Sequence, residues 1–188
     1  PNNLDAYTDL SRYYLTPELL LRETVAGAPL KSFLNTLISS LASGNTPGSS
    51  EELLYDLTTM LVQENLPLIS SYYQLQTARI ATRKELFARL LKGKEFLDDH
   101  IFQTVEMKQV AQACYLSEFR FYRLFKQAFG ISPYQYLLNN RIEKSLELKK
   151  LNLSWTEIAL LLNFSDLAAF SNAFKKIKGV FPNNFSLQ

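Results

Sequence analysis

One short stretch in the second half of the chain carries the side chains best suited to chemistry with a partner. If residues 118–129 form a helix, its apolar residues recur at helical spacing on one face, namely Phe121, Leu124, Phe125 and Ala128. The opposite face then carries cations and aromatic rings, namely Phe119, Arg120, Tyr122, Arg123 and Lys126. Arginine can donate two hydrogen bonds to one guanine, lysine neutralises phosphate, and aromatic edges contact thymine methyl groups. This face therefore predicts contact with the major groove of double-stranded DNA.

The alternative interpretation of this face is a solvated surface with scattered aromatic residues. Exposed Phe and Tyr side chains lower solubility unless a partner covers them. That cost favours the binding interpretation over the solvated one.

The region around this helix repeats one sequence pattern. Leu124-Phe125-Lys126 precedes Gly130-Ile131-Ser132-Pro133, and Ala173-Phe174-Lys175 precedes Gly179-Val180-Phe181-Pro182, an offset of 49 residues from Leu124 to Ala173. Just upstream, Val110-Ala111 matches Ile158-Ala159 at an offset of 48 residues. Repetition of a short unit indicates an internal duplication. We interpret it as two helix-turn-helix units in tandem.

The helix boundaries around these units follow from capping signals. Ser117 caps the first cationic helix and Gly130 ends it, while Ser154 with Glu157 forms a capping box and Ser165-Asp166 begins a helix over Leu167–Lys178. Between the units, a helix from Pro133 to Leu151 would span roughly 28 Å. That length is close to the ~34 Å between successive major grooves on one side of DNA. The expected fold is all-α, with two helix-turn-helix units joined by a long helix.

Residues 1–80 predict a small helical region ahead of the reading units at 81–188. One helix runs from Pro17 to Gly27 and a second begins at Pro29, with a loop at Gly44–Ser49. A third begins at Ser49 or Ser50, and Asn65-Leu66-Pro67 is expected to break it. We interpret this half as a helical connector, as a remnant of an upstream regulatory domain, or as a regulatory bundle of its own.

Composition excludes several classes of protein. The net charge of +2 divides into −3 over residues 1–88 and +5 over residues 89–188, so the basic half is the one expected to meet phosphate. No apolar run is long enough to span a bilayer, which favours a cytoplasmic protein with no membrane partner. A single Cys114, a single His100 and no glycine-rich phosphate loop argue against an enzyme, a metal site and a cofactor. Because the chain begins at Pro1, a segment upstream is expected to be missing.

The segment from about Lys84 to Phe185 resembles the DNA-binding domain of the AraC/XylS family of bacterial transcription regulators. It covers a little over half of the chain. The first unit and the long helix contribute Val110-Ala111, Leu116-Ser117, Phe121, Arg123-Leu124-Phe125-Lys126, Gly130-Ile131-Ser132-Pro133, Tyr136 and Arg141. The second unit contributes Ser154, Glu157-Ile158-Ala159, Asn163-Phe164-Ser165-Asp166, Phe170, Phe174-Lys175-Lys176 and Gly179.

The resemblance implies seven helices that insert one helix of each unit into adjacent major grooves. It places the base-reading positions of the first unit on Phe119, Tyr122 and Arg123, with Arg120 beside them. It places those of the second unit on Leu167, Ala168, Ser171 and Asn172. Lys175, near the end of the second reading helix, is expected to contact phosphate.

Four positions depart from the family pattern. Tyr115 stands where the first turn usually has Gly, so we expect strain and a reshaped turn, whereas Asn163 in the second turn tolerates the left-handed region. Asn172 replaces a frequent Arg, which predicts weaker sequence reading by the second unit. Phe181 replaces Ser, which we interpret as a packing change.

The expected partners are double-stranded DNA, RNA polymerase, and a second copy of the chain bound through the N-terminal or a missing upstream region. The resemblance predicts a sequence-specific transcription regulator. The alternative is a helical protein-interaction module in which DNA binding has been weakened or lost, because the second reading helix lacks arginine.

Overall fold

The computed structural model describes residues 28–44, 48–76 and 80–186. Over these residues the ordered elements are helices, with no strand, which confirms the all-α prediction. The helix predicted from Pro17 to Gly27 lies outside the described residues. The chain divides between Tyr73 and Gln74 into two compact units, an N-terminal and a C-terminal one.

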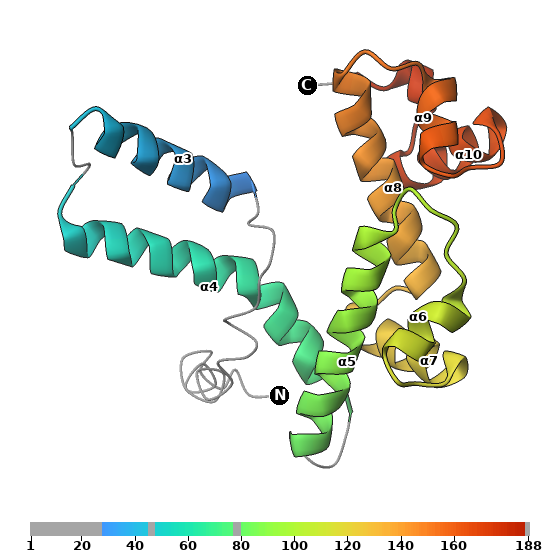
Figure 1. Cartoon of the computed structure of the whole chain (residues 1–188), viewed down its shortest axis with the longest axis horizontal. Helices are drawn as coiled ribbons and strands as arrows, with labels where there is room; N and C mark the ends of the chain where they lie inside the picture. The colour runs from blue at the N-terminus through green and yellow to red at the C-terminus, as the bar shows by residue number, and fades with distance from the viewer. Residues whose placement is uncertain (1–27, 45–47, 77–79, 187–188) are drawn as a thin grey trace. The chain divides into compact units, whose positions relative to one another are not determined.

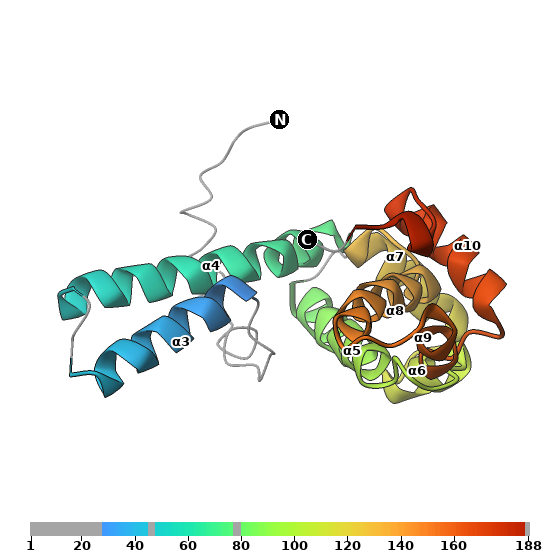
Figure 2. The same cartoon turned by 90° about the horizontal axis from the view of Figure 1, so that it is seen from above.

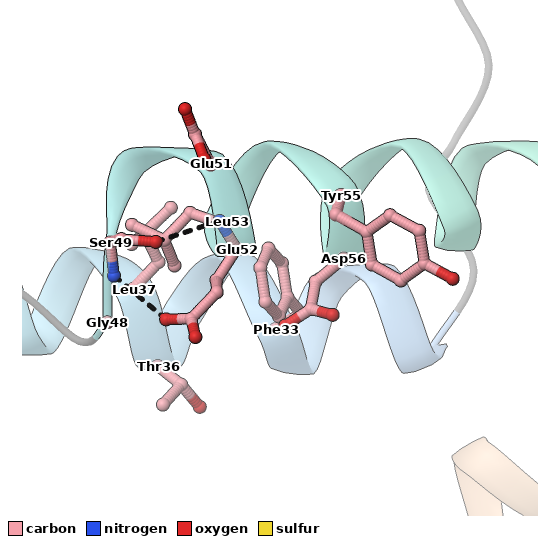
Figure 3. A pocket seen from close by; sticks show the side chains of 10 residues that line it. All are labelled: Phe33, Thr36, Leu37, Gly48, Ser49, Glu51, Glu52, Leu53, Tyr55 and Asp56. Carbon is pink, nitrogen blue, oxygen red and sulfur yellow. Dashed lines mark hydrogen bonds between the residues drawn. The ribbon is translucent and has the colours of Figure 1, made fainter.

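The N-terminal unit contains α3 (Ala28–Ala42) and α4 (Ser50–Gln74). The cap predicted at Ser49 or Ser50 is Ser49, which forms a capping box with Glu52 at the start of α4. The backbone N–H of Glu52 donates to Ser49 Oγ at 3.2 Å, and the backbone N–H of Ser49 donates to Glu52 Oε2 at 2.9 Å (Figure 3). These two bonds satisfy donors that the first turn of a helix leaves unpaired.

The break expected at Pro67 was wrong, because α4 continues through it to Gln74. Proline removes one backbone donor but leaves its own carbonyl available, and Ser71 Oγ donates to Pro67 O at 2.8 Å. One turn earlier, the side-chain amide of Asn65 donates to Leu61 O at 2.7 Å. Side chains on either side of Pro67 thus hydrogen-bond to backbone carbonyls, and the helix tolerates the missing bond.

The C-terminal unit holds six α-helices and a terminal 3₁₀ turn among its described residues. They are α5 (Ile80–Asp99), α6 (Met107–Ala113), α7 (Glu118–Phe129), α8 (Pro133–Lys150), α9 (Trp155–Leu161), α10 (Leu167–Lys178) and η1 (Pro182–Asn184). Figure 1 shows α6 and α7 near one end of α8 and α9 and α10 near the other. Figure 2 shows the helices of this unit gathered around α8. The two helix-turn-helix units and the long helix between them are therefore confirmed.

The first helix-turn-helix unit packs against α5 around a core of aromatic and branched side chains. Gly93 on α5 allows the close approach, because a Cβ there would lie 2.6 Å from Phe121 Cε2 and 2.7 Å from Cys114 Sγ. The fully buried members of this core include Phe87, Leu90, Val110, Ala111, Phe121, Phe125 and Ala128.

The second helix-turn-helix unit has its own core, to which α8 contributes Ile142. The other buried members of this core are Ile158, Ala159, Leu162, Phe170 and Phe174. Since α8 also packs against α5 and α7, one helix carries both reading units.

Candidate nucleic-acid interface

The predicted cationic helix is α7, and its ends are fixed as expected. Ser117 Oγ accepts a hydrogen bond from the backbone N–H of Arg120, and Gly130 ends the helix at φ 75°. The stripe predicted to be buried is buried, so the helix can adopt only one rotation about its axis. That rotation exposes Phe119, Arg120, Tyr122, Arg123 and Lys126, the residues predicted as the contact face.

The aromatic rings of this face are unusually open to solvent. Phe119 is 77% exposed and Tyr122 is 47% exposed. Arg123 lies over the ring of Phe119, with its Cζ 6.0 Å from the ring centroid, where the guanidinium and the π face attract one another. This contact holds the Arg123 side chain beside the aromatic residues that would lie next to it in a groove. A shallow depression lined by Met107, Glu118, Phe119, Phe121, Tyr122 and Pro133 adjoins the face.

The turn that leads into α7 does not take the altered shape we expected. Tyr115 adopts φ 55°, and the Leu116 N–H donates to Ala111 O at 3.0 Å. In the second unit Asn163 adopts φ 60°, and the Phe164 N–H donates to Ala159 O at 2.9 Å. Both turns therefore keep one geometry, since this backbone bond and the buried helices on either side fix the left-handed residue whatever its side chain. The strain at Tyr115 is accommodated without a change of shape.

The second predicted contact helix is α10. Asp166 is its N-cap, with Oδ1 accepting from the Ala169 N–H at 2.6 Å, and Gly179 ends it at φ 81°. Of the predicted contact residues, Leu167, Ala168, Asn172 and Lys175 are exposed, and Ser171 is half-buried. Together they form a smaller and less charged face than that of α7.

The lysines at the end of α10 differ in their surroundings. Lys175 Nζ lies 4.4 Å from the ring centroid of Phe181, so the Phe in place of the family's Ser packs against a predicted phosphate contact. Lys178, at the same end of the helix, pairs with Glu143 Oε1 on α8 at 2.6 Å, and its side chain is only 20% exposed. The outward charge of this helix is therefore lower than its sequence suggests.

Sequence reasoning missed a set of polar residues that join the two units. Asp98 Oδ1 accepts from Tyr136 Oη and from Asn140 Nδ2, each at 2.6 Å, which ties the end of α5 to α8. Arg141 on α8 is buried, and its guanidinium donates to backbone carbonyls of the loop after α5. Burial lowers the pKa of Arg141, although not enough to remove its charge near neutral pH. One sequence signal could have identified Arg141 as a buried residue. Helical periodicity places this arginine among apolar residues of α8.

The single histidine and the single cysteine make contacts within the protein. The His100 ring stacks on Phe96 with 4.0 Å between the ring centroids, and its Nδ1 lies 2.7 Å from Phe96 O at the end of α5. Cys114 is fully buried, and burial raises its thiol pKa to about 11. Among the described residues, no cluster of His, Cys, Asp and Glu is placed to hold a metal ion.

A groove between α3 and α4 is a further concave feature (Figure 3). Phe33, Leu37 and Leu53 lie on its apolar side, while the Glu52 carboxylate is used in the capping box. Figure 3 shows Glu51 pointing away from these apolar side chains. Thr36, Tyr55 and Asp56 add polar groups to its lining.

Comparison with known proteins finds a domain family and relatives that match the C-terminal half of the chain. Residues 110–188 match the model of a helix-turn-helix domain family. The chain is 28% identical over 91 residues to the "Probable transcriptional regulator LumQ" of Photobacterium leiognathi, a match that covers 48% of this chain and 37% of that protein. It is 28% identical over 158 residues to the "Msm operon regulatory protein" of Streptococcus mutans, covering 79% of this chain and 53% of that protein. The chain thus spans between about a third and a half of these relatives.

Among solved structures, the chain is similar to the C-terminal domain of AraT, described as a response regulator from Geobacillus stearothermophilus. The two are 32% identical, with a TM-score of 0.48, and the match covers 50% of this chain and 80% of that one.

None of the helices that the structure describes is both long enough and apolar enough to cross a bilayer.

Proposed function

This chain belongs to the AraC/XylS family of transcription regulators, and on that premise we propose that it binds duplex DNA with its tandem helix-turn-helix units and regulates transcription from there. The observation that carries the proposal is the exposed face of α7. A capped helix with a fully buried apolar stripe holds three cations and two exposed rings outward in one fixed orientation. Such a face matches the donors and methyl groups of a major groove.

The finer assignment within the groove gives each exposed residue a task. Arg123, held beside Phe119, is proposed to donate to guanine, and the two rings to contact neighbouring thymine methyl groups. Arg120 and Lys126 flank them and are proposed to neutralise phosphates, as is Lys175 on α10. On the second helix Leu167, Ala168, Ser171 and Asn172 are proposed to face the adjacent groove.

The N-terminal unit is proposed to supply the contacts of the regulator with a second copy of itself. Ile38, Leu41, Leu54, Leu61 and Leu66 are exposed apolar residues on α3 and α4. A contact with RNA polymerase, action in the cytoplasm and the absence of enzymatic activity are proposed from the family alone.

The experiment that tests DNA binding is a salt titration of affinity for duplex DNA, with two charge reversals of identical chemistry. Lys126→Glu lies on the α7 face, and Lys31→Glu lies at an exposed position of α3. The logarithm of affinity should fall linearly with the logarithm of salt concentration for the wild type and for Lys31→Glu. Lys126→Glu should bind more weakly, with a shallower slope. Equal binding by the two variants, or no duplex binding by the wild type, would refute the proposal. Either result would favour the alternative, a helical protein-interaction module.

A further inference from the structure

The loop that connects α5 to α6 precedes the first reading helix in sequence but is attached to the second reading unit. The side chain of Ile101 in this loop packs against the core of the second unit. Two carbonyls of the same loop are held by Arg141, whose Nε donates to Ile101 O at 2.9 Å and whose Nη2 donates to Gln103 O at 2.6 Å. The third guanidinium nitrogen, Nη1, lies 3.5 Å from Asn163 O in the turn before α10. A single buried arginine therefore bonds to both sides of the junction.

Asn163 adds a second bond across the same junction. Its Nδ2 donates to Thr104 Oγ1 at 2.9 Å, between residues that lie 59 positions apart in the chain. The turn itself requires only a residue that tolerates φ 60°, which glycine does at no steric cost. The turn therefore does not require the Asn163 amide, and the amide's contribution is the hydrogen bond to Thr104. At the equivalent place in the first unit, the side chain of Tyr115 is 77% exposed.

We propose that Thr104, Arg141 and Asn163 form an inter-unit clamp, a set of positioning residues that fixes α10 relative to α7 and so sets the separation of the two DNA contacts. This inference rests on the proposed function for its DNA consequence but not for its geometry. A helix such as α8, 18 residues long, curves and bends under load when it is the only connection between two bodies. The clamp is a second attachment between the two helix-turn-helix units, so that they are joined at two points and not by α8 alone.

The parts of the clamp differ in strength. Arg141 is only 9% exposed, and removal of its side chain would take away the donors that hold the carbonyls of Ile101 and Gln103. The Asn163–Thr104 bond is exposed and weaker, but it can be removed without disturbing the turn. We therefore expect Arg141 to restrict most of the motion between the two helix-turn-helix units, and Asn163 to make a smaller contribution.

The clamp can be tested in the full chain without DNA by measuring distances between two spin labels. Gln112→Cys on α6 and Leu160→Cys on α9 give exposed attachment points, and the native Cys114 is buried with its thiol pKa raised to about 11, which disfavours its labelling at neutral pH. This doubly labelled protein is compared with three derivatives. They carry Asn163→Gly with Thr104→Val, Arg141→Lys, and the control Tyr115→Gly, which places glycine at the matching turn of the first unit.

The expected result is one narrow distance distribution in the parent and in Tyr115→Gly, and a broadened or shifted one in both clamp variants. Lysine keeps the charge of Arg141 but cannot reach three carbonyls at once, so it should not restore the narrow distribution. If Arg141→Lys fails to fold, the Asn163→Gly/Thr104→Val variant decides. A parent-like distribution in every folded clamp variant would overturn the clamp.

Its DNA consequence is read by hydroxyl-radical footprinting of the same proteins. The parent should protect two backbone segments at a fixed separation, and the clamp variants should keep the first segment while the second spreads over neighbouring positions. Broadened label distances with unchanged footprints would overturn the assignment of spacing to the clamp while leaving DNA binding intact. Absence of any footprint in the parent would instead refute the proposed function, and the label distances would still judge the geometry.

Discussion

Two arginines of the C-terminal unit carry the same charge and are placed for opposite purposes. Arg123 lies on the outer face of α7 beside an exposed ring, whereas Arg141 on α8 is buried against backbone carbonyls. A side chain whose donors are already used inside the protein is unavailable to a base edge. Of these two arginines, Arg123 is therefore the one whose guanidinium is exposed and placed to meet a base edge.

Arg123→Ala should weaken binding to a selected DNA site by about 1–3 kcal/mol, because a bidentate contact with guanine would be lost. Arg123→Lys is the matched control, since it keeps the positive charge but not the planar pair of donors. It should lose nearly as much affinity for the selected site while retaining the salt slope of the wild type. Titration of labelled duplex monitored by fluorescence anisotropy measures both. Wild-type affinity in the alanine variant would show that Arg123 does not read a base.

The outward residues of α7 were predictable because amphipathic periodicity and a Ser117 cap leave the helix one rotation. Helical periodicity could have placed Arg141 among apolar residues, but its partners were not predictable, because they are main-chain carbonyls at Ile101 and Gln103, 40 and 38 positions away, and main-chain atoms leave no trace in a sequence. The pairing of Lys178 with Glu143 escaped prediction for a similar reason. Helical periodicity shows which residues share a face, but not which other helix that face meets.

Helix boundaries were predictable wherever a cap or a left-handed residue marks them. Ser117, Ser154, Asp166 and Gly130 each perform the predicted task, and Gly179 ends α10 in the same left-handed conformation as Gly130. Pro67 was misread because a proline inside a helix removes one hydrogen bond without always ending the helix, and α4 continues on both sides of it. Whether a proline ends a helix or is absorbed by it depends on neighbouring side chains and tertiary contacts rather than on the proline itself.

The two equivalent turns offer a paired test of what a side chain contributes at a left-handed position. Tyr115→Gly should stabilise the protein by about 1 kcal/mol, because strain at positive φ is relieved and the tyrosine side chain is largely exposed. Asn163→Gly should be neutral or slightly destabilising, since Asn tolerates this region and the bond to Thr104 would be lost. Urea unfolding of both variants gives the two free energies. Stabilisation by both substitutions to the same degree would contradict a contribution from the Asn163 amide.

Gly93 is a second position at which a small change of side chain should alter stability, because alanine would add a single Cβ atom there. Gly93→Ala is expected to destabilise the protein by about 1–3 kcal/mol, despite the higher helix propensity of alanine, because the new Cβ would meet Phe121 and Cys114 at less than contact distance. Lys92→Ala, at the exposed neighbouring position, should change stability by no more than about 0.5 kcal/mol. Thermal unfolding followed by circular dichroism compares the two. A Gly93→Ala protein as stable as the wild type would mean that α5 can move away from α6 and α7 at little cost.

Charge is distributed unevenly over the chain as a whole. The half that contains the reading units is net basic and the half that precedes it is net acidic, which restricts attraction for phosphate to one end of the chain. Within the basic half, charge is uneven again, because α7 presents Arg120, Arg123 and Lys126 outward while Lys178 of α10 pairs with Glu143. Long-range attraction should therefore favour docking through the first unit.

The two reading heads should consequently be unequal in what they read. Along its front α10 offers Leu167, Ala168 and Asn172, which can contact thymine methyl groups or adenine but provide no strong grip on guanine. Lys175 and Lys176 are exposed near its end, and lysines there can hold phosphate, which positions a protein without reading sequence. Selection of binding sites from a random DNA library should yield a sharp motif over one half-site and a blurred, A/T-leaning one about 10 base pairs away.

A matched variant separates this asymmetry from simple weakness of the second contact. Asn172→Arg introduces the residue type frequent in the family at an exposed position of α10. It should sharpen the second half-site toward guanine while leaving the first unchanged, because the clamp holds both helices at a constant separation. Lys175→Ala should instead weaken binding to all sequences alike, since a phosphate contact carries no base information. Two equally sharp half-sites selected by one wild-type chain would contradict the asymmetry, because the exposed front of α10 would then be reading bases without arginine.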